Sequence, residues 1–348
     1  MAASVRFEDP PPAHLELCYP GGPDRWRSLL MRSSSLRVLK LQSFRSVGMS
    51  VVLQTFRHLP YLEELDWQLG LPRDDIAAAS TSRIEMVRLL TVTLTGVTSG
   101  CATVLRHLII PEEAVVTAIF NADRDEPLCS RFSTSLWDAS IQDRFGGPVD
   151  RGGGPDDLRI SQSDTLLVVL LGTSRKQQMR RTHTTFMIFK MASAEQLQIL
   201  RALQDRFALP TIVSLSVVTS PAGAVGVDEW AEVLAHCPQI MSLSLVNTLS
   251  ARMIFDALNS CASGTDPAST LLCNLKQIVV NDTSDVREDW FDACRTFIAN
   301  RCAAIEAMAR PRGLDSLYLQ ECKSIMEDEL KSLEMLVPVK LVGGFEFW

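Results

Sequence analysis

The residues of this chain that could do chemistry are few, and none of them forms a recognised catalytic motif. Asp123, Asp125 and Glu126 lie together as the oxygen ligands of a hard cation do. The other ligand positions and the turn glycine of a cation loop are absent, so we interpret the three as solvated charges. Gly152–Gly154 follow no predicted strand and open no predicted helix, which argues against a phosphate-binding loop. The sequence also lacks the motifs G-x-x-x-x-G-K-S/T, G-x-G-x-x-G, G-x-S-x-G and H-E-x-x-H.

The histidines and cysteines are better explained by structure than by catalysis. His58 and His236 each lie just before a proline that ends a predicted helix, where an imidazole can interact with the last helical carbonyls. Cys237 and Cys322 fall at turns where a small side chain packs inside, rather than at a nucleophile site. We therefore expect no enzyme activity, no cofactor and no metal site.

The elements that must position any functional surface are seven apolar hexads of the form L-x-x-L-x-L, with conservative replacements. The last two apolar positions are two residues apart and so point to one side of a strand, and the first covers the same core on the approach. The hexads are Leu36/Leu39/Leu41, Leu62/Leu65/Trp67, Val87/Leu90/Val92, Ile212/Leu215/Val217, Ile240/Leu243/Leu245, Leu275/Ile278/Val280 and Leu314/Leu317/Leu319.

The spacing of the hexads predicts the fold class. The first three begin 26 and 25 residues apart, and the last four begin 28, 35 and 39 residues apart. The first two steps are typical of leucine-rich repeats, in which each unit buries its apolar side only by stacking on its neighbours. Longer helices or insertions on the outer side would explain the longer C-terminal steps. We predict an α/β leucine-rich-repeat solenoid with a curved parallel sheet, outer helices and an irregular middle section.

Helical stripes separate the hexads. Val52, Phe56 and Leu59 form one stripe before Pro60, and the same order of helix, proline and strand recurs at Pro238. Further stripes are predicted at Trp230/Val233/Leu234, Trp290/Phe291/Cys294/Phe297/Ile298 and Ile325/Leu330/Leu333/Met335.

The predicted organisation has an irregular lead-in at 1–35 with one short helix at 24–31, followed by the solenoid at 36–348. Within the solenoid we predict a loop-rich insertion at about 121–160, strands at 166–171 and 186–191, a helix at 193–207 and a C-terminal cap at about 323–348.

Composition limits the partners. The 348 residues carry a net charge of −7, which argues against nucleic acid. The basic run 175–183 is either a solvated loop rim or a contact for an anion or acidic peptide. The longest apolar stretch, 166–171, is too short to cross a bilayer, so no membrane partner is expected. Nine cysteines with irregular spacing and no visible signal peptide predict a cytoplasmic or nuclear location.

The best candidate site is the solvent side of the predicted strands, on the concave face of the solenoid. Because side chains alternate along a strand, the residues between the core positions line this face. Charged and small polar residues are also what any exposed sheet carries, and Tyr318 is the strongest single anchor. We expect a protein target to contact Lys40, Gln42, Glu64, Asp66, Gln68, Ser214, Ser216, Ser244, Gln277, Asn281, Tyr318 and Gln320.

The stretch 36–70, with Leu-Arg-Val-Leu-Lys-Leu and His-Leu-Pro-Tyr-Leu-Glu-Glu-Leu, resembles the opening repeats of fungal F-box leucine-rich-repeat proteins, of the type found in mushroom-forming fungi. Further resemblance lies in 101–111, 230–245 and 314–330. The resemblance implies the substrate-recognition subunit of a cullin-type ubiquitin ligase.

An F-box itself is not visible in the chain. Only 35 residues precede Leu36, and they contain no Leu-Pro-x-Glu motif. We therefore expect a cullin-ligase adaptor as partner only if an F-box is encoded upstream. The alternative is a free-standing leucine-rich-repeat scaffold unrelated to ubiquitination.

Overall fold

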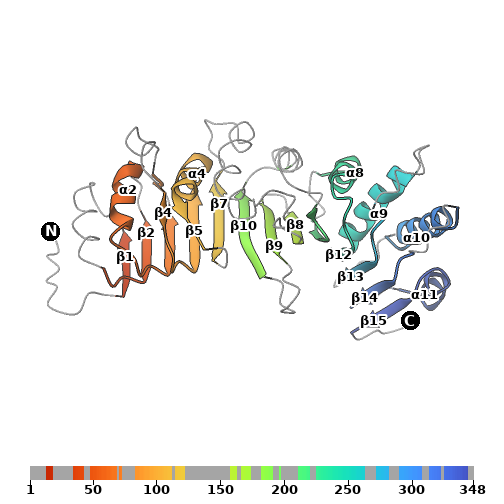
Figure 1. Cartoon of the computed structure of the whole chain (residues 1–348). Coiled ribbons are helices and arrows are strands. Elements are labelled where there is room, and N and C mark those ends of the chain that lie inside the picture. The colour runs from red at the N-terminus through yellow and green to blue at the C-terminus, as the bar shows by residue number, and fades with distance from the viewer. Residues whose placement is uncertain are drawn as a thin grey trace. The chain divides into compact units, whose positions relative to one another are not determined.

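The computed structural model describes most of the repeat hexads and the helices between them (Figure 1). The described residues are 13–18, 34–42, 48–68, 70–72, 83–111, 114–121, 157–162, 166–173, 182–190, 196, 211–219, 225–262, 272–281, 290–307, 313–322 and 325–343. The predicted helices at 24–31 and 193–207, the basic run 175–183 and nearly all of the predicted insertion lie outside them, apart from single residues or short ends.

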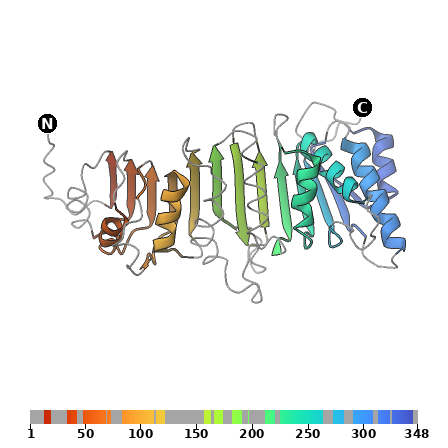
Figure 2. The same cartoon turned by 90° about the horizontal axis from the view of Figure 1, so that it is seen from above.

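The chain forms two compact units, which are described separately. Unit 1 comprises Met1–Gly153 and His183–Lys190, and unit 2 comprises Gly154–Thr182 and Met191–Trp348. Both have mixed α/β structure, in which helices lie on one face of a largely parallel sheet (Figures 1 and 2).

Unit 1 is built from parallel strands in the order β1-β2-β3-β5-β7-β10. Its elements are β1 (His14–Cys18), β2 (Val38–Gln42), α2 (Met49–Phe56), β3 (Glu64–Gln68), β4 (Ile84–Glu85), β5 (Thr91–Gly96), α4 (Thr98–His107), β6 (Leu108–Ile109), β7 (Val115–Asn121) and β10 (Thr182–Lys190). The short strands β4 and β6 pair with each other in a separate small sheet.

Strand β1 lies inside the segment that the sequence analysis predicts as an irregular lead-in. The segment His-Leu-Glu-Leu-Cys pairs in register with β2, so that Leu15 is aligned with Leu39 and Leu17 with Leu41. Its alternation of polar and apolar residues is that of a strand, but the prolines and glycines on either side of it obscured the pattern.

Unit 2 has the strand order β9-β8-β11-β12-β13-β14-β15, and all its pairs are parallel except β8 with β9. Its elements are β8 (Asp157–Gln162), β9 (Leu166–Thr173), β11 (Ser214–Val218), α8 (Val227–Ala235), β12 (Ser242–Val246), α9 (Thr248–Ala262), β13 (Gln277–Asn281), α10 (Trp290–Ala307), β14 (Ser316–Gln320), α11 (Glu327–Glu334) and β15 (Val339–Val342). The predicted strands at 166–171 and 186–191 correspond to β9 and β10.

The register of the strands places the hexads side by side within each unit. In unit 1 Leu39, Leu65 and Val92 are aligned, and in unit 2 Leu243 is aligned with Ile278. All five side chains are fully buried. Apart from Met335, the helical stripes bury their predicted residues against the same core, which is the arrangement that stacked repeats require.

The predicted core positions of the third hexad are wrong. Val87 and Leu90, predicted as core, are exposed, and Leu89 is buried in their place together with Val92 and Leu94. Both Val87/Leu90/Val92 and Leu89/Val92/Leu94 fit the motif L-x-x-L-x-L, and the position of the strand decides which of the two sets is buried. Since β5 begins at Thr91, only the later phase repeats the offset between first leucine and strand seen in the other hexads. Met335 is a smaller correction, because it caps α11 and points to solvent.

Candidate functional site: the open faces of the two sheets

The open face of each sheet is the one opposite its helices. On β3 and β12 the burial pattern alternates between buried and partly exposed side chains, so the residues between the core leucines reach the open face. The predicted partner-binding residues lie on these faces, five of them in unit 1 and seven in unit 2. They are considered unit by unit.

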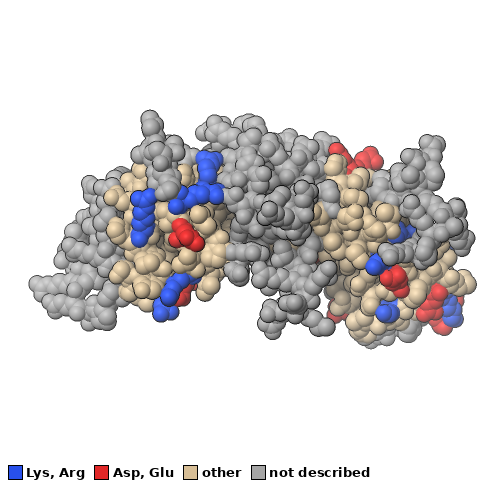
Figure 3. Space-filling view, viewed as in Figure 1, with Lys and Arg blue, Asp and Glu red and all other residues tan. Residues whose placement is uncertain are grey.

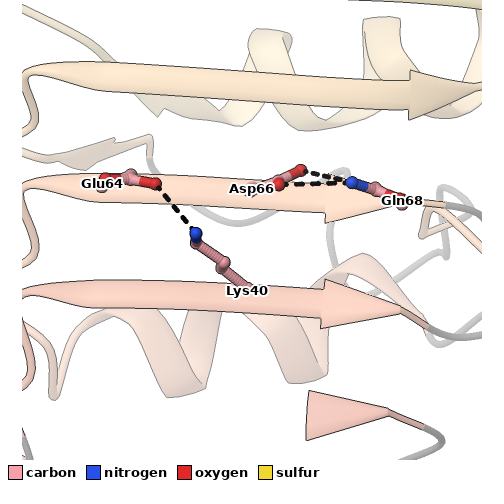
Figure 4. A network of polar contacts seen from close by, with 4 residues as sticks. All are labelled: Lys40, Glu64, Asp66 and Gln68. Carbon is pink, nitrogen blue, oxygen red and sulfur yellow. Dashed lines mark hydrogen bonds and ion pairs between the residues drawn. The ribbon is translucent and has the colours of Figure 1, made fainter. Parts of the chain in front are cut away.

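In unit 1 the predicted residues form two neighbouring polar groups, Lys40 with Glu64 and Asp66 with Gln68 and Gln42. Figure 4 shows the Lys40–Glu64 and Asp66–Gln68 contacts. Lys40 Nζ lies 3.8 Å from Glu64 Oε1. The Gln68 amide donates to both Asp66 carboxylate oxygens at 3.3 and 3.4 Å and accepts from Gln42 Nε2 at 3.3 Å. The parallel register explains these contacts, because it aligns Lys40 with Asp66 and Gln42 with Gln68. Neighbouring strands then lie only about 4.8 Å apart.

Burial raises the pKa of Asp66 above the ordinary aspartate range, and the carboxylates of Glu64 and Glu16 add to the rise. The hydrogen bond from Gln68 and the charge of Lys40 oppose it in part. Glu16 is on β1, inside the predicted lead-in, two strands from Asp66 with Lys40 aligned between them, and its position could not be predicted from the sequence.

We expect the pKa of Asp66 to be higher than that of an ordinary aspartate. Because the folded state then holds the proton more tightly than the unfolded state, wild type gains stability relative to Asp66→Asn as the pH falls through the folded pKa. At neutral pH Asp66→Asn is expected to be at least as stable as wild type. Carboxyl carbon NMR shifts and urea unfolding at several pH values measure both effects, and a titration in or below the ordinary range would contradict the prediction.

In unit 2 the open face carries a row of side chains aligned across six strands. Parallel register places Arg159, Ser216, Ser244, Val279, Tyr318 and Lys340 side by side. The middle of the row is made of two serines and a valine, and its two ends carry the longer side chains. At about 4.8 Å between strands, the row spans roughly 24 Å, the length of about seven extended residues.

Tyr318 and Lys340 form one end of this row. Lys340 Nζ donates to Tyr318 Oη at 2.9 Å and lies 4.8 Å from the centre of the tyrosine ring. This hydrogen bond, together with one from Ser316, lowers the pKa of the Tyr318 phenol. Tyr318 was predicted from the sequence but Lys340 was not, although the apolar-charged-apolar order of Val339, Lys340 and Leu341 is a signal for it.

Replacing Lys340 with methionine is expected to raise the pKa of Tyr318, because the methionine keeps much of the side chain but removes the donor and the charge. Tyrosinate absorbance recorded against pH in wild type and variant measures the shift. Lys331→Met is the matched control, since Lys331 pairs with Glu327 on α11. An unchanged titration in Lys340→Met would mean that the contact with Tyr318 does not persist in solution.

The remaining predicted residues of unit 2 differ in how far their side chains are exposed to solvent. Ser216, Ser244, Gln277 and Gln320 are half-buried, whereas Ser214 has only 8% of its surface exposed and offers little to a partner. Asn281 is half-buried at the end of β13, and its side-chain Oδ1 has no hydrogen-bond partner among the described residues.

A buried polar network at the ends of β11 and β12 was not predicted. Asn247, with a positive φ of 83°, donates to the Thr219 carbonyl at 2.8 Å and accepts from the Ser250 amide at 2.8 Å. The Thr219 amide donates in turn to Ser250 Oγ at 2.7 Å. These bonds fix the turn that leads from β12 into α9.

The structure gives the surroundings of several of the histidines and cysteines noted in the sequence. His236 Nδ1 lies 2.8 Å from the Glu232 carbonyl near the end of α8, as predicted. Cys237 and Cys322 are buried, and burial raises the pKa of Cys237 to about 12, so its thiol is protonated at neutral pH. No three His, Cys, Asp or Glu residues are grouped to hold a metal among the described ranges. The acidic cluster at 123–126 and the glycines at 152–154 lie outside them.

No family model matches the chain, and no curated protein matches it. The leucine-rich repeat-containing protein LegL7 from Legionella pneumophila is a similar solved structure, at 13% sequence identity and a TM-score of 0.39. The match covers 94% of this chain and 88% of that chain. Of the helices within the described residues, none is both long enough and apolar enough to span a bilayer.

Proposed function

We propose that this chain is a non-catalytic leucine-rich-repeat solenoid protein whose open sheet faces bind a protein partner. The observation that carries the proposal is the aligned row of unit 2, in which Ser216 and Ser244 lie between the longer side chains of Arg159 and Tyr318. Small side chains on a rigid ladder leave room for a partner's own side chains. An aromatic residue and charged residues at the ends supply anchors.

The open face of unit 1 supports the same function with different chemistry. Lys40, Glu64, Asp66 and Gln68 offer charges and amides that are held in place by one another rather than by the core (Figure 4). A partner can exchange these contacts for its own at little cost in stability, because exposed pairs contribute only about 0–1 kcal/mol. Polar complementarity of this kind favours specificity and rate of association over raw affinity.

The test compares three variants as bait against extract from the organism's cells. Ser244→Arg fills the middle of the row, Tyr318→Ala removes its anchor, and Arg252→Ala changes an exposed residue of α9, on the helix side. We expect wild type and Arg252→Ala to retain the same protein and both open-face variants to lose at least about tenfold in affinity for it. Retention by all baits alike, or by none, would contradict the proposal.

We further propose that the partner is a degradation substrate of a cullin-type ubiquitin ligase. The support is the resemblance of the repeats at 36–70 and 314–330 to F-box leucine-rich-repeat proteins. The genomic sequence upstream of Met1 is to be translated and the longer product tested for binding to the ligase adaptor. Adaptor binding supports the ligase role, and its absence in the full-length product favours the free-standing scaffold.

A further inference from the structure

Exposed apolar side chains gather on one edge of unit 1. This return edge consists of residues 57–63, 83–90 and 106–111, which lead from one layer of the unit into the next strand. Tyr61, Val87, Leu90 and Ile109 on it have 46%, 62%, 60% and 45% of their surface exposed. Scattered apolar residues are ordinary on a protein surface, but four on consecutive returns of one unit call for an explanation.

Backbone and side-chain contacts join these residues into one strip. The Leu90 amide donates to the Glu63 carbonyl at 2.7 Å, and the Arg88 guanidinium lies 4.8 Å from the centre of the Tyr61 ring. Tyr61 therefore lies beside segment 83–90, which contains Leu90.

Segment 83–90 of the return edge also contacts segment 106–111. The Met86 amide donates to the Ile109 carbonyl at 2.9 Å, and β4 aligns Glu85 with Ile109. Ile84 and Met86 are buried while Glu85 and Val87 are exposed, so Val87 lies on the outward side that Glu85 shares with Ile109.

The strip is basic in an acidic protein. Within the return edge four arginines stand against two glutamates, and Figure 3 shows basic side chains, with some acidic ones among them, on the described part of unit 1. The chain as a whole carries a net charge of −7, so this excess is local. The arginines are Arg57, Arg83, Arg88 and Arg106, and the glutamates are Glu63 and Glu85. Glu63 is already engaged by Arg37 at 3.2 Å.

We propose that the return edge is a second docking surface, separate from the open faces, for an acidic segment of a partner protein that carries apolar side chains. Complementary charge attracts the segment, and its apolar side chains cover Tyr61, Val87, Leu90 and Ile109. Arg88 contributes twice, because it holds the Tyr61 ring and presents a positive charge. A nucleic acid would satisfy the arginines but would leave the apolar half of the strip uncovered.

The probe is a display library of random twelve-residue peptides, selected on the full chain and counter-selected on Leu90→Ser/Arg88→Glu. We expect the recovered peptides to be rich in Asp and Glu together with Leu, Ile or Phe. Their affinity, measured by fluorescence polarisation, is expected to fall at least about tenfold in Leu90→Ser and in Arg88→Glu separately. It is also expected to fall with added salt.

Matched controls separate this edge from general surface effects and from the open faces. Met335→Ser removes an 83% exposed apolar residue from unit 2, and Arg295→Glu reverses an exposed arginine on α10. Both, and the open-face variant Ser244→Arg, are expected to leave peptide affinity within about twofold. A loss confined to Ser244→Arg would instead assign the peptides to the open face.

Three results would overturn the proposal. They are the recovery of no peptide that discriminates wild type from the counter-selection variant, the recovery of basic peptides, and binding of single-stranded DNA at this edge in place of peptides. Circular dichroism of each variant identifies any that has failed to fold. Tyr61→Phe is a further variant that keeps the ring and its packing, so it is expected to bind nearly as wild type does.

Discussion

Replacing Arg301 with methionine is expected to lower the free energy of unfolding by about 3 kcal/mol or more, because the change strands buried carbonyl groups. Arg301 is on α10 and has only 6% of its surface exposed. Its guanidinium donates to the carbonyls of Leu272, Cys273 and Leu275 at 2.8, 3.1 and 2.8 Å. Each buried carbonyl left without a donor costs about 1–3 kcal/mol.

The turn that Arg301 holds is unusual in its backbone. Leu272 has a positive φ of 57°, a conformation that costs a residue with a side chain about 1 kcal/mol or more. The turn leads directly into β13, whose residues Gln277 and Asn281 lie on the open face. Loss of the guanidinium is therefore expected to loosen the start of β13 as well as to destabilise unit 2.

Two variants on the same helix make the Arg301 prediction specific. Arg295→Met removes an exposed arginine paired with Asp292 at 3.1 Å, and is expected to cost less than about 0.5 kcal/mol. Arg301→Lys keeps the charge, but an ammonium group cannot donate to three carbonyls as the planar guanidinium does. Its loss in free energy of unfolding should therefore lie between those of Arg295→Met and Arg301→Met. Urea unfolding followed by circular dichroism gives all three values. Equal losses in Arg295→Met and Arg301→Met would refute the role assigned to the buried carbonyls.

The sequence predicts those parts of the structure that depend on local pattern. Leu243 and Leu245 could be assigned to the core because a period of two within a strand allows only one set of buried positions. Trp230, Val233 and Leu234 followed from the helical period in the same way. The parallel pairing of neighbouring strands in each unit then follows from repetition.

The sequence fails where a residue's surroundings depend on another part of the chain. Val87/Leu90/Val92 and Leu89/Val92/Leu94 satisfy the same motif, and only the start of β5 selects the second. That ambiguity hid the apolar strip of the return edge. Glu16 and Lys340 were missed for a related reason, since each reaches its site through pairing of a strand at the end of a unit's sheet.

Arg301 is the clearest case of a residue whose contacts no local pattern could assign. Its three acceptors lie 26 to 29 residues earlier in the chain, in a turn between α9 and β13. An arginine in a helix ordinarily belongs to the solvated face, and although Arg301 continues the stripe that begins at Trp290, four residues after Phe297, the sequence does not show which groups it would contact inside. The candidate surface was predicted by alternation, whereas the contacts that hold that surface in place came only with the structure.

Truncation of Trp290 to alanine is expected to lower the free energy of unfolding by about 3–5 kcal/mol, the usual loss for a large aromatic side chain removed from a core. Trp290 is 1% exposed at the start of α10. Its ring stacks on Phe255 of α9 with 6.5 Å between ring centres, and it meets Phe291 edge-on at 6.0 Å. The side chain therefore fills the space between two neighbouring helices of unit 2.

Part of the loss should be specific to the aromatic pair rather than to burial alone. Trp290→Leu restores much of the apolar volume without the ring, so it is expected to be more stable than Trp290→Ala but less stable than Trp290→Phe. In a double-mutant cycle with Phe255→Leu, the coupling energy should be about 0.5–1.5 kcal/mol. Met335→Ala, at an 83% exposed position, serves as the control and is expected to change stability by less than about 0.5 kcal/mol.

The Trp290 series also bears on function, because α9 packs against β12 and β13. If Trp290→Ala separates α9 from α10, the strands under α9 lose part of their support, and binding at Ser244 should weaken together with stability. Trp290→Phe, which keeps the helices packed, should leave partner binding unchanged. Loss of stability in Trp290→Ala with full binding at Ser244 would mean that the open face does not depend on this helical packing.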